Sequence, residues 1–187
     1  MTRFDAYQIL GAHLKNPNLV KHSLTAEAAM QGLCRYLNAS PTKEEVEEWG
    51  ITGLLHDADY EETTGHPELH GIKITEEINL PENIARAIKG HNFQYTKVMP
   101  QTQMEWAIAT CDQLTGLIVA CTLVHPDKRL ASVTPDFILK RFYEKSFAKG
   151  ADRETILLCE SKLNIPLIKF IEIILKSMQE IAGNLGL

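Results

Sequence analysis

The chain of 187 residues lacks the features that mark secreted, membrane and repetitive proteins. Its first residues, MTRFDAYQIL, contain no apolar signal core, and its longest uncharged apolar run, about 114–124, is too short to span a bilayer. Neither a low-complexity segment nor an internal repeat is present. We therefore expect a cytoplasmic protein with no membrane partner.

Cysteine is scarce and is not arranged for a disulfide framework or a zinc ribbon. No two cysteines form a C-x-x-C pair, and most lie in apolar stretches; they are Cys34, Cys111, Cys121 and Cys159. This usage is typical of cysteine as a small hydrophobic side chain in a reducing compartment. The sequence therefore gives no indication of a structural zinc site.

Excess positive charge is missing too, because the net charge is -5. General nucleic-acid binding normally depends on a strongly positive surface, so we do not expect nucleic acid as a partner. One segment, 128–153, has seven basic residues against three acids, and it leaves RNA binding open as an alternative.

Alternating β-branched residues, which would indicate strands, are absent, whereas apolar residues recur at spacings of three and four. Proline also marks helix starts, because the first turn of a helix tolerates its missing N–H; these prolines are Pro41, Pro81, Pro135 and Pro166. The pattern predicts helices at about 4–15, 18–38, 42–56, 67–79, 81–90, 102–124, 135–147, 152–162 and 166–182. We predict an all-α domain of orthogonally packed helices.

The most apolar predicted helix, 104–124, carries one charge in its middle, Asp112. This aspartate shares a face with Ile108 and Val119, so it is expected to point into the core. An unpaired buried carboxylate is strongly unfavourable or becomes neutral, so the position requires a compensating partner. We expect a cation next to Asp112.

Four histidines are predicted to point inward from other helices or from their ends: His22, His56, His70 and His91. Each one alone is more often a core histidine with satisfied hydrogen bonds than a metal ligand. Together with Asp112 and the adjacent Asp57, they favour a divalent metal centre, because neutral imidazoles and carboxylates are its usual ligands.

The order of these residues resembles the H…HD…D signature of the HD superfamily of metal-dependent phosphohydrolases, whose members are all-helical. The matching residues are His22, His56, Asp57 and Asp112. His70, in HPELHG, and His91, in KGHN, fall where some members carry two ligands of a second metal. The resemblance covers about 18–125 and implies an HD-type metal-binding core there, with 126–187 as a C-terminal helical extension of the single domain 1–187.

The resemblance implies hydrolysis of a phosphoester or phosphoanhydride bond in a small phosphorylated metabolite or nucleotide, by a metal-activated water. The ligand types suit one or two ions of manganese, iron, cobalt, nickel or zinc, with magnesium also compatible. Asp57 is the predicted bridging ligand, because a carboxylate can bind two ions at once. A non-catalytic sensor that binds metal or a nucleotide is the alternative function.

The residues after the dipeptide, in HDADYE, lack the Gly-Lys or early Glu of some subfamilies, so the resemblance does not identify the acid/base residue. Asp59 and Glu61 are candidates, either to orient a ligand histidine or to move a proton. The alternative is that both are acids exposed on a loop.

Four basic residues are candidates for binding the substrate phosphate: Lys73, Lys140, Arg141 and Lys145. Arg141, Lys145 and Lys149 are spaced by four and would form one positive edge of a helix and its exit, while Lys73 lies one turn after His70. The alternative is a solvated charged face. The apolar side of the last predicted helix indicates either packing on its own core or the seam of a homodimer.

Overall fold

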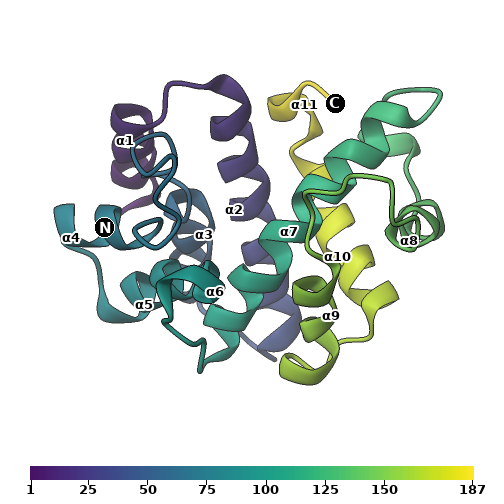
Figure 1. Cartoon of the computed structure of the whole chain (residues 1–187). Helices are drawn as coiled ribbons and strands as arrows, with labels where there is room; N and C mark the ends of the chain where they lie inside the picture. Colours follow the sequence, from purple (N-terminus) through teal and green to yellow (C-terminus); the bar gives the residue numbers. More distant parts are fainter.

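The computed structural model describes residues 1–187 and consists of helices joined by turns and loops (Figure 1). The helices are α1 (Arg3–His13), α2 (Pro17–Leu37), α3 (Lys43–Leu55), α4 (Ile72–Glu77), α5 (Glu82–His91), α6 (Phe93–Thr96), α7 (Gln103–Val124), the 3-10 turn η1 (Leu130–Ser132), α8 (Pro135–Phe142), α9 (Arg153–Lys162), α10 (Leu167–Glu180) and α11 (Ala182–Leu185). The predicted all-α class is confirmed.

Threonine caps fix where several of these helices begin. Thr2 and Thr42 each form a capping box, with Asp5 and Glu45 respectively three residues later, at the starts of α1 and α3. Thr102 accepts a hydrogen bond from the Glu105 N–H at the start of α7. These local contacts fix the starts of α3 and α7, which lead to His56 and carry Asp112.

Helices α2 and α7 run between two groups of helices. In Figure 1, α1, α3, α4 and α5 lie on the left and α8, α9 and α10 on the right. The smaller hydrophobic core joins α1, α3, α4 and α5, and the larger one joins α2, α7, α8, α9 and α10. The 126–187 segment therefore shares a core with α2 and α7.

Helix α7 is long and apolar enough to cross a membrane by length and composition, although the uncharged run within it is short. Two thirds of its most apolar window is buried inside the bundle. Burial in the core therefore accounts for its composition, as in the central helix of a soluble protein.

Close approach of α2 and α3 depends on Gly53. A Cβ at this position would lie 2.5 Å from the carbonyl oxygen of Ala26, so a side chain there would force the two helices apart. His22 precedes Ala26 by one turn and His56 follows Gly53 by three residues. The contact thus sets the separation of two predicted metal ligands.

Two predicted helices are shorter than expected. The 67–79 helix begins only at Ile72, because Gly71 adopts the left-handed conformation at φ 82° and ends a series of turns. The 135–147 helix ends at Phe142. The carbonyls of Phe142, Phe147, Ala148 and Ala151 accept hydrogen bonds from the Arg153 guanidinium. Lys145 and Lys149 consequently lie beyond the helix, and the predicted positive helix edge is wrong.

The apolar side of α10 packs inside its own chain. Phe170, Ile171, Ile174, Leu175 and Met178 are all buried in the larger core. This is the simpler of the two predictions for the last helix, and it leaves these side chains no role in a homodimer seam.

Candidate metal centre

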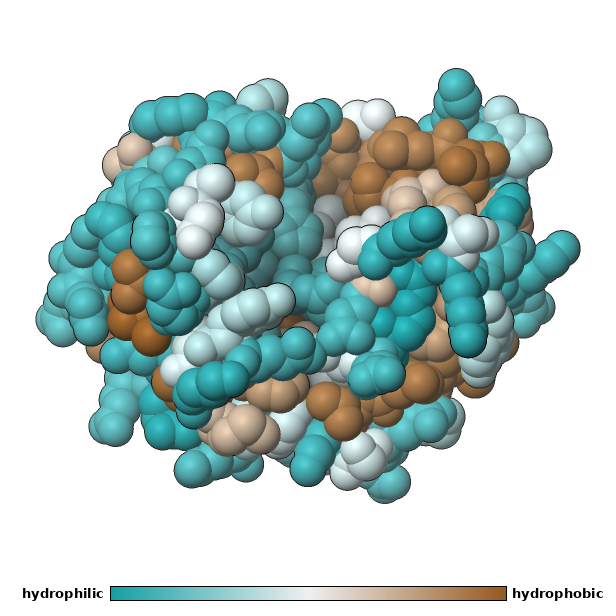
Figure 2. Space-filling view, in the orientation of Figure 1, coloured by the Kyte–Doolittle hydropathy of each residue, from teal (hydrophilic) through white to brown (hydrophobic).

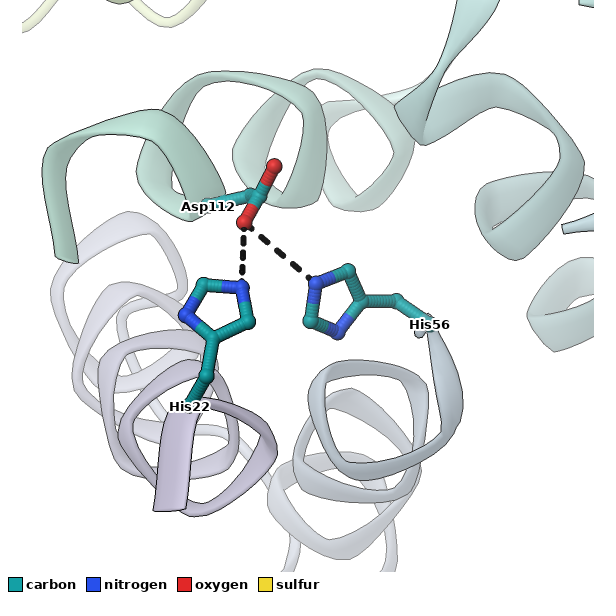
Figure 3. A group of neighbouring side chains, drawn as sticks. All are labelled: His22, His56 and Asp112. Atoms are coloured by element: carbon teal, nitrogen blue, oxygen red, sulfur yellow. Dashed lines mark ion pairs between the residues drawn. The ribbon is translucent and has the colours of Figure 1, made fainter. Parts of the chain in front are cut away.

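The six histidines and aspartates predicted to bind metal come from five parts of the chain and meet between the helices. His22 lies on α2, His56 caps the end of α3 and Asp57 follows it. His70 lies just before α4, His91 is the last residue of α5, and Asp112 lies in the middle of α7. Figure 3 shows His22, His56 and Asp112 pointing toward one another.

The first group within this cluster centres on Asp112. Its Oδ1 lies 2.8 Å from His22 Nε2 and 3.4 Å from His56 Nε2 (Figure 3). One potential ligand atom from each of the three residues lies within 4.8 Å of the others, a spacing at which they could hold one ion. The sequence-predicted partner of the buried Asp112 is therefore a pair of imidazoles at a candidate cation site.

Asp57 occupies the centre of the whole cluster. Its Oδ1 lies 2.9 Å from His70 Nε2, 3.3 Å from His56 Nε2 and 3.6 Å from His91 Nε2. Its Oδ2 lies 3.4 Å from His22 Nε2. His56, Asp57 and His91 form a second group with metal-ligand spacing. Asp57 is thus the one carboxylate within reach of all four histidines.

The imidazole hydrogen bonds fit a metal-binding set. His56 Nδ1 lies 2.8 Å from the Gly53 carbonyl and His91 Nδ1 lies 2.6 Å from the Ile88 carbonyl. A carbonyl only accepts, so each Nδ1 carries a proton, which leaves Nε2 as the atom through which each ring can bind a metal. His56 Nε2 is buried and makes no hydrogen bond, although the oxygens of Asp57 and Asp112 lie nearby. Electron-pair donors that face one another in a buried site suit a bound cation.

In the protein alone, protons on two of the imidazoles balance the negative charge of the aspartates. Burial opposes protonation of His22, but the ion pair with Asp112 prevails and raises the pKa of this imidazole to about 9. Burial likewise opposes protonation of His70, while hydrogen bonds to Asp57 and Asp59 raise its pKa to about 10. Against the effect of burial, the imidazoles hold the pKa of the Asp57 and Asp112 carboxyls well below the usual range. Both aspartates are therefore negative and draw positive charge.

Asp59 orients a ligand from outside the cluster. The side chain is fully buried, and its Oδ1 lies 2.8 Å from His70 Nδ1. Its carboxylate also accepts from the N–H groups of Gly71 and Ile74 at the start of α4. Asp59 does not line the cavity, so its geometry matches the predicted orienting role and not proton transfer to a substrate.

Gln113 holds the other aspartate and was not predicted from the sequence. Its Nε2 donates to Asp112 Oδ2 at 2.9 Å, which leaves Oδ1 for the two histidines. Its Oε1 accepts from the Asp152 N–H at 3.1 Å. The amide thus joins Asp112 to the loop before α9. A polar residue next to Asp112 in an otherwise apolar helix was the available sequence signal.

A cavity of about 490 Å³ opens onto the cluster. Residues from α2, the turns after α3, the end of α5, α7 and the loop before α9 line it: Leu19, His22, Asp57, Tyr60, His70, His91, Asn92, Asp112, Gln113, Gly116, Ala148, Gly150 and Ala151. Figure 2 shows the surface hollowed near the centre of this face, between the turns that follow α3 and the α8–α9 loop. The volume is within the range of small-molecule sites.

The structure places several other predicted site residues away from this cavity. Glu61 is exposed, and its Oε2 accepts from the Lys15 N–H at the end of α1. Lys73 is paired with Glu62 at 2.7 Å and with Glu77 at 2.5 Å. Neither residue lines the cavity, so the predicted roles in proton transfer and phosphate binding do not match their positions.

The predicted phosphate-binding residues of the basic segment also lie outside the lining. Lys140 and Lys145 are exposed. Arg141 pairs with Glu144 at 2.7 Å and stacks against Phe137 and Phe147. The segment lines the cavity only with Ala148, Gly150 and Ala151. The charge pattern of the sequence did not indicate these small residues.

Comparison with known families gives one match. A family model described as HD domain matches residues 19–117, which is more than half of the chain. All six predicted metal ligands lie inside the matched range. No curated protein and no solved structure matches the chain.

Proposed function

Because the chain belongs to the HD domain family, whose members are typically metal-dependent phosphohydrolases, we propose that it hydrolyses a phosphorylated metabolite or nucleotide with the aid of divalent metal. The observation that carries this proposal is the position of Asp57, within 3.6 Å of a nitrogen of all four histidines. The cytoplasm and a small anionic substrate remain predictions that are consistent with it.

The side chains divide into two overlapping ligand groups under this proposal. His22, His56, Asp57 and Asp112 would hold one ion, and Asp57, which belongs to both groups, would hold a second with His70 and His91. A divalent ion supplies a water of lowered pKa, down from about 15.7 toward neutrality, and polarises a phosphoryl oxygen. The mixed nitrogen and oxygen donors favour manganese, iron, cobalt, nickel or zinc over calcium.

The chain contributes position and charge to the reaction. Asp59 keeps the His70 Nδ1–H occupied, so that its Nε2 is directed at Asp57. Gln113 occupies Asp112 Oδ2, so that Oδ1 is directed at the histidines. Such outer partners fix ligand orientation and raise metal affinity. Hydrolysis then adds water across a P–O bond, which breaks as the leaving oxygen takes a proton.

The direct test combines metal content with hydrolysis. Protein purified without chelator is analysed for metal, supplied with Mn²⁺, and assayed on p-nitrophenyl phosphate and bis-p-nitrophenyl phosphate, then on a metabolite panel. We expect bound metal and hydrolysis in the wild type, and loss of both in Asp57→Asn with the circular dichroism spectrum unchanged. Metal binding without hydrolysis of any compound in the panel would favour the sensor alternative.

A further inference from the structure

The cavity wall beyond the metal cluster carries no charge. Its other residues are Leu19, Tyr60, Asn92, Gln113, Gly116, Ala148, Gly150 and Ala151. No lysine or arginine is among the lining residues. The negative charge of a bound ligand can therefore be balanced only at the cluster itself, and an unbalanced charge elsewhere in the cavity is unfavourable.

The basic side chains of the segment that forms this side of the wall are occupied or directed elsewhere. The Arg153 guanidinium donates to carbonyls at 2.5 Å from Phe147 and Ala148 and at 2.6 Å from Ala151. Arg141 is held by Glu144. Lys149 is exposed and outside the lining, although the residues on both sides of it contribute to the wall. Arginines of the basic segment thus build the loop and do not face the ligand.

The uncharged part of the wall suits a neutral, polar group. The Tyr60 ring lies edge-on to His70 with ring centroids 5.3 Å apart, and its hydroxyl has no partner in the chain. Asn92 donates through Nδ2 to the Pro67 carbonyl, which leaves its Oδ1 as a free acceptor. Gly116 and Gly150 leave room beside these groups. A hydroxyl-bearing body could contact the aromatic ring and the amide oxygen.

We propose that this cavity selects phosphomonoesters, with one terminal phosphate at the metal cluster and a compact, uncharged, hydroxyl-bearing group against Tyr60 and Asn92. The inference rests on the proposed function and gives its substrate class. Water adds across the ester P–O bond, the leaving oxygen takes a proton, and the products are orthophosphate and a neutral alcohol. Diphosphates and triphosphates are selected against, because each further phosphate adds negative charge that no side-chain cation of the wall balances.

Binding of simple anions tests the charge argument independently of hydrolysis. Calorimetry compares orthophosphate, pyrophosphate and tripolyphosphate on the Mn²⁺-loaded protein at the same buffered free Mn²⁺ concentration. We expect orthophosphate to bind at least tenfold more tightly than either longer anion. Equal or tighter binding of pyrophosphate or tripolyphosphate would overturn the inference.

Gly116 offers a matched pair of variants that changes only the charge of the wall. A Cβ at this position meets no atom within 4 Å, so the first atom of a new side chain fits without a clash. Gly116→Lys should raise the affinity ratio of tripolyphosphate to orthophosphate at least tenfold, whereas Gly116→Gln should leave it unchanged. An equal ratio in both variants would contradict the inference.

Lys149→Ala is the control for the rim of the cavity. The anion affinity ratios should stay within about twofold of the wild type, because this side chain lies outside the lining. A larger change would show that the rim supplies a cation and would overturn the inference. If orthophosphate binds best but no monoester is hydrolysed, the proposed function fails while charge selection stands. If monoesters are hydrolysed but polyphosphates bind best, only the inference fails.

Discussion

Two groups of histidine and acidic side chains have the composition of a metal site, but they differ in what balances their charge. The buried cluster around Asp57 contains imidazoles and carboxylates with no lysine or arginine among the cavity-lining residues. The other group, His13, Glu62 and Glu77, lies on the surface, and Lys73 contacts both of its glutamates. Ligand types and spacing alone therefore do not distinguish the two.

Burial and the kind of cation that balances the charge make the difference. Asp57 is 5% exposed and His56 is fully buried, so neither can rely on water. Glu62 and Glu77 are partly solvated, and the Lys73 ammonium already lies between them. In the buried cluster a metal would replace exchangeable protons on His22 and His70. In the surface group it would have to displace the Lys73 ammonium, which is covalently part of the chain.

The largest expected effect comes from Asp57→Asn, which breaks the buried cluster at its centre. The amide keeps the shape but removes the charge that lies near all four histidines. We expect hydrolysis to fall by more than the roughly 10- to 100-fold cost of losing an outer partner. Metal content by elemental analysis should fall in parallel, and a variant that retained wild-type metal would contradict the proposed centre.

Metal removal should lower the stability of the wild type and leave the stability of a variant without the metal centre unchanged. A ligand that binds only the folded state at 100 times its Kd stabilises it by about 2.7 kcal/mol. Chelation should therefore lower the melting temperature of the wild type, and Mn²⁺ should restore it. Glu62→Gln, in the surface group, should show the full shift and Asp57→Asn none. A full shift in Asp57→Asn would locate the metal elsewhere.

Gln113→Glu should have an intermediate effect, because it acts on a ligand from outside the ligand set. The new carboxylate can still accept from the Asp152 N–H but can no longer donate to Asp112 Oδ2, and it adds a like charge beside it. We expect Mn²⁺ affinity to fall about 10- to 100-fold by calorimetry. Unchanged affinity would show that Asp112 needs no such partner.

The smallest effect should follow Lys73→Met, which removes the cation from the surface group. Metal content per chain should stay at the wild-type value, and the melting temperature should change little, because exposed ion pairs contribute little to stability. An additional bound ion in Lys73→Met would contradict this prediction. It would show that the lysine alone keeps metal from the surface group.

The sequence predicted the parts of the site that depend on helix faces. His22 and Asp112 lie on α2 and α7, whose apolar periodicity showed which side would be buried. His56 and His91 lie at the ends of α3 and α5, so the same reasoning extended to them. The family resemblance and the all-α class agree with the matched HD domain model.

Residues in turns escaped this reasoning because no periodicity fixes their direction. Asp59 and Glu61 are two residues apart, yet one is fully buried and the other is exposed. Lys73 lies on α4, but its pairing with Glu62 depends on the path of the turns before this helix, which periodicity does not describe. The misplaced Lys145 reflects a helix that ends at Phe142, where the Arg153 Nε–H donates to the Phe142 carbonyl.

Gly71 has a consequence for the cluster that its left-handed backbone alone does not suggest. A methyl group there would lie 2.7 Å from the Ile88 carbonyl oxygen and 3.1 Å from the His91 ring. It would push apart the loop that carries His70 and the helix that carries His91. The Nε2 atoms of these two histidines are 3.1 Å apart. The gap between two imidazoles is thus set by a residue with no side chain at all.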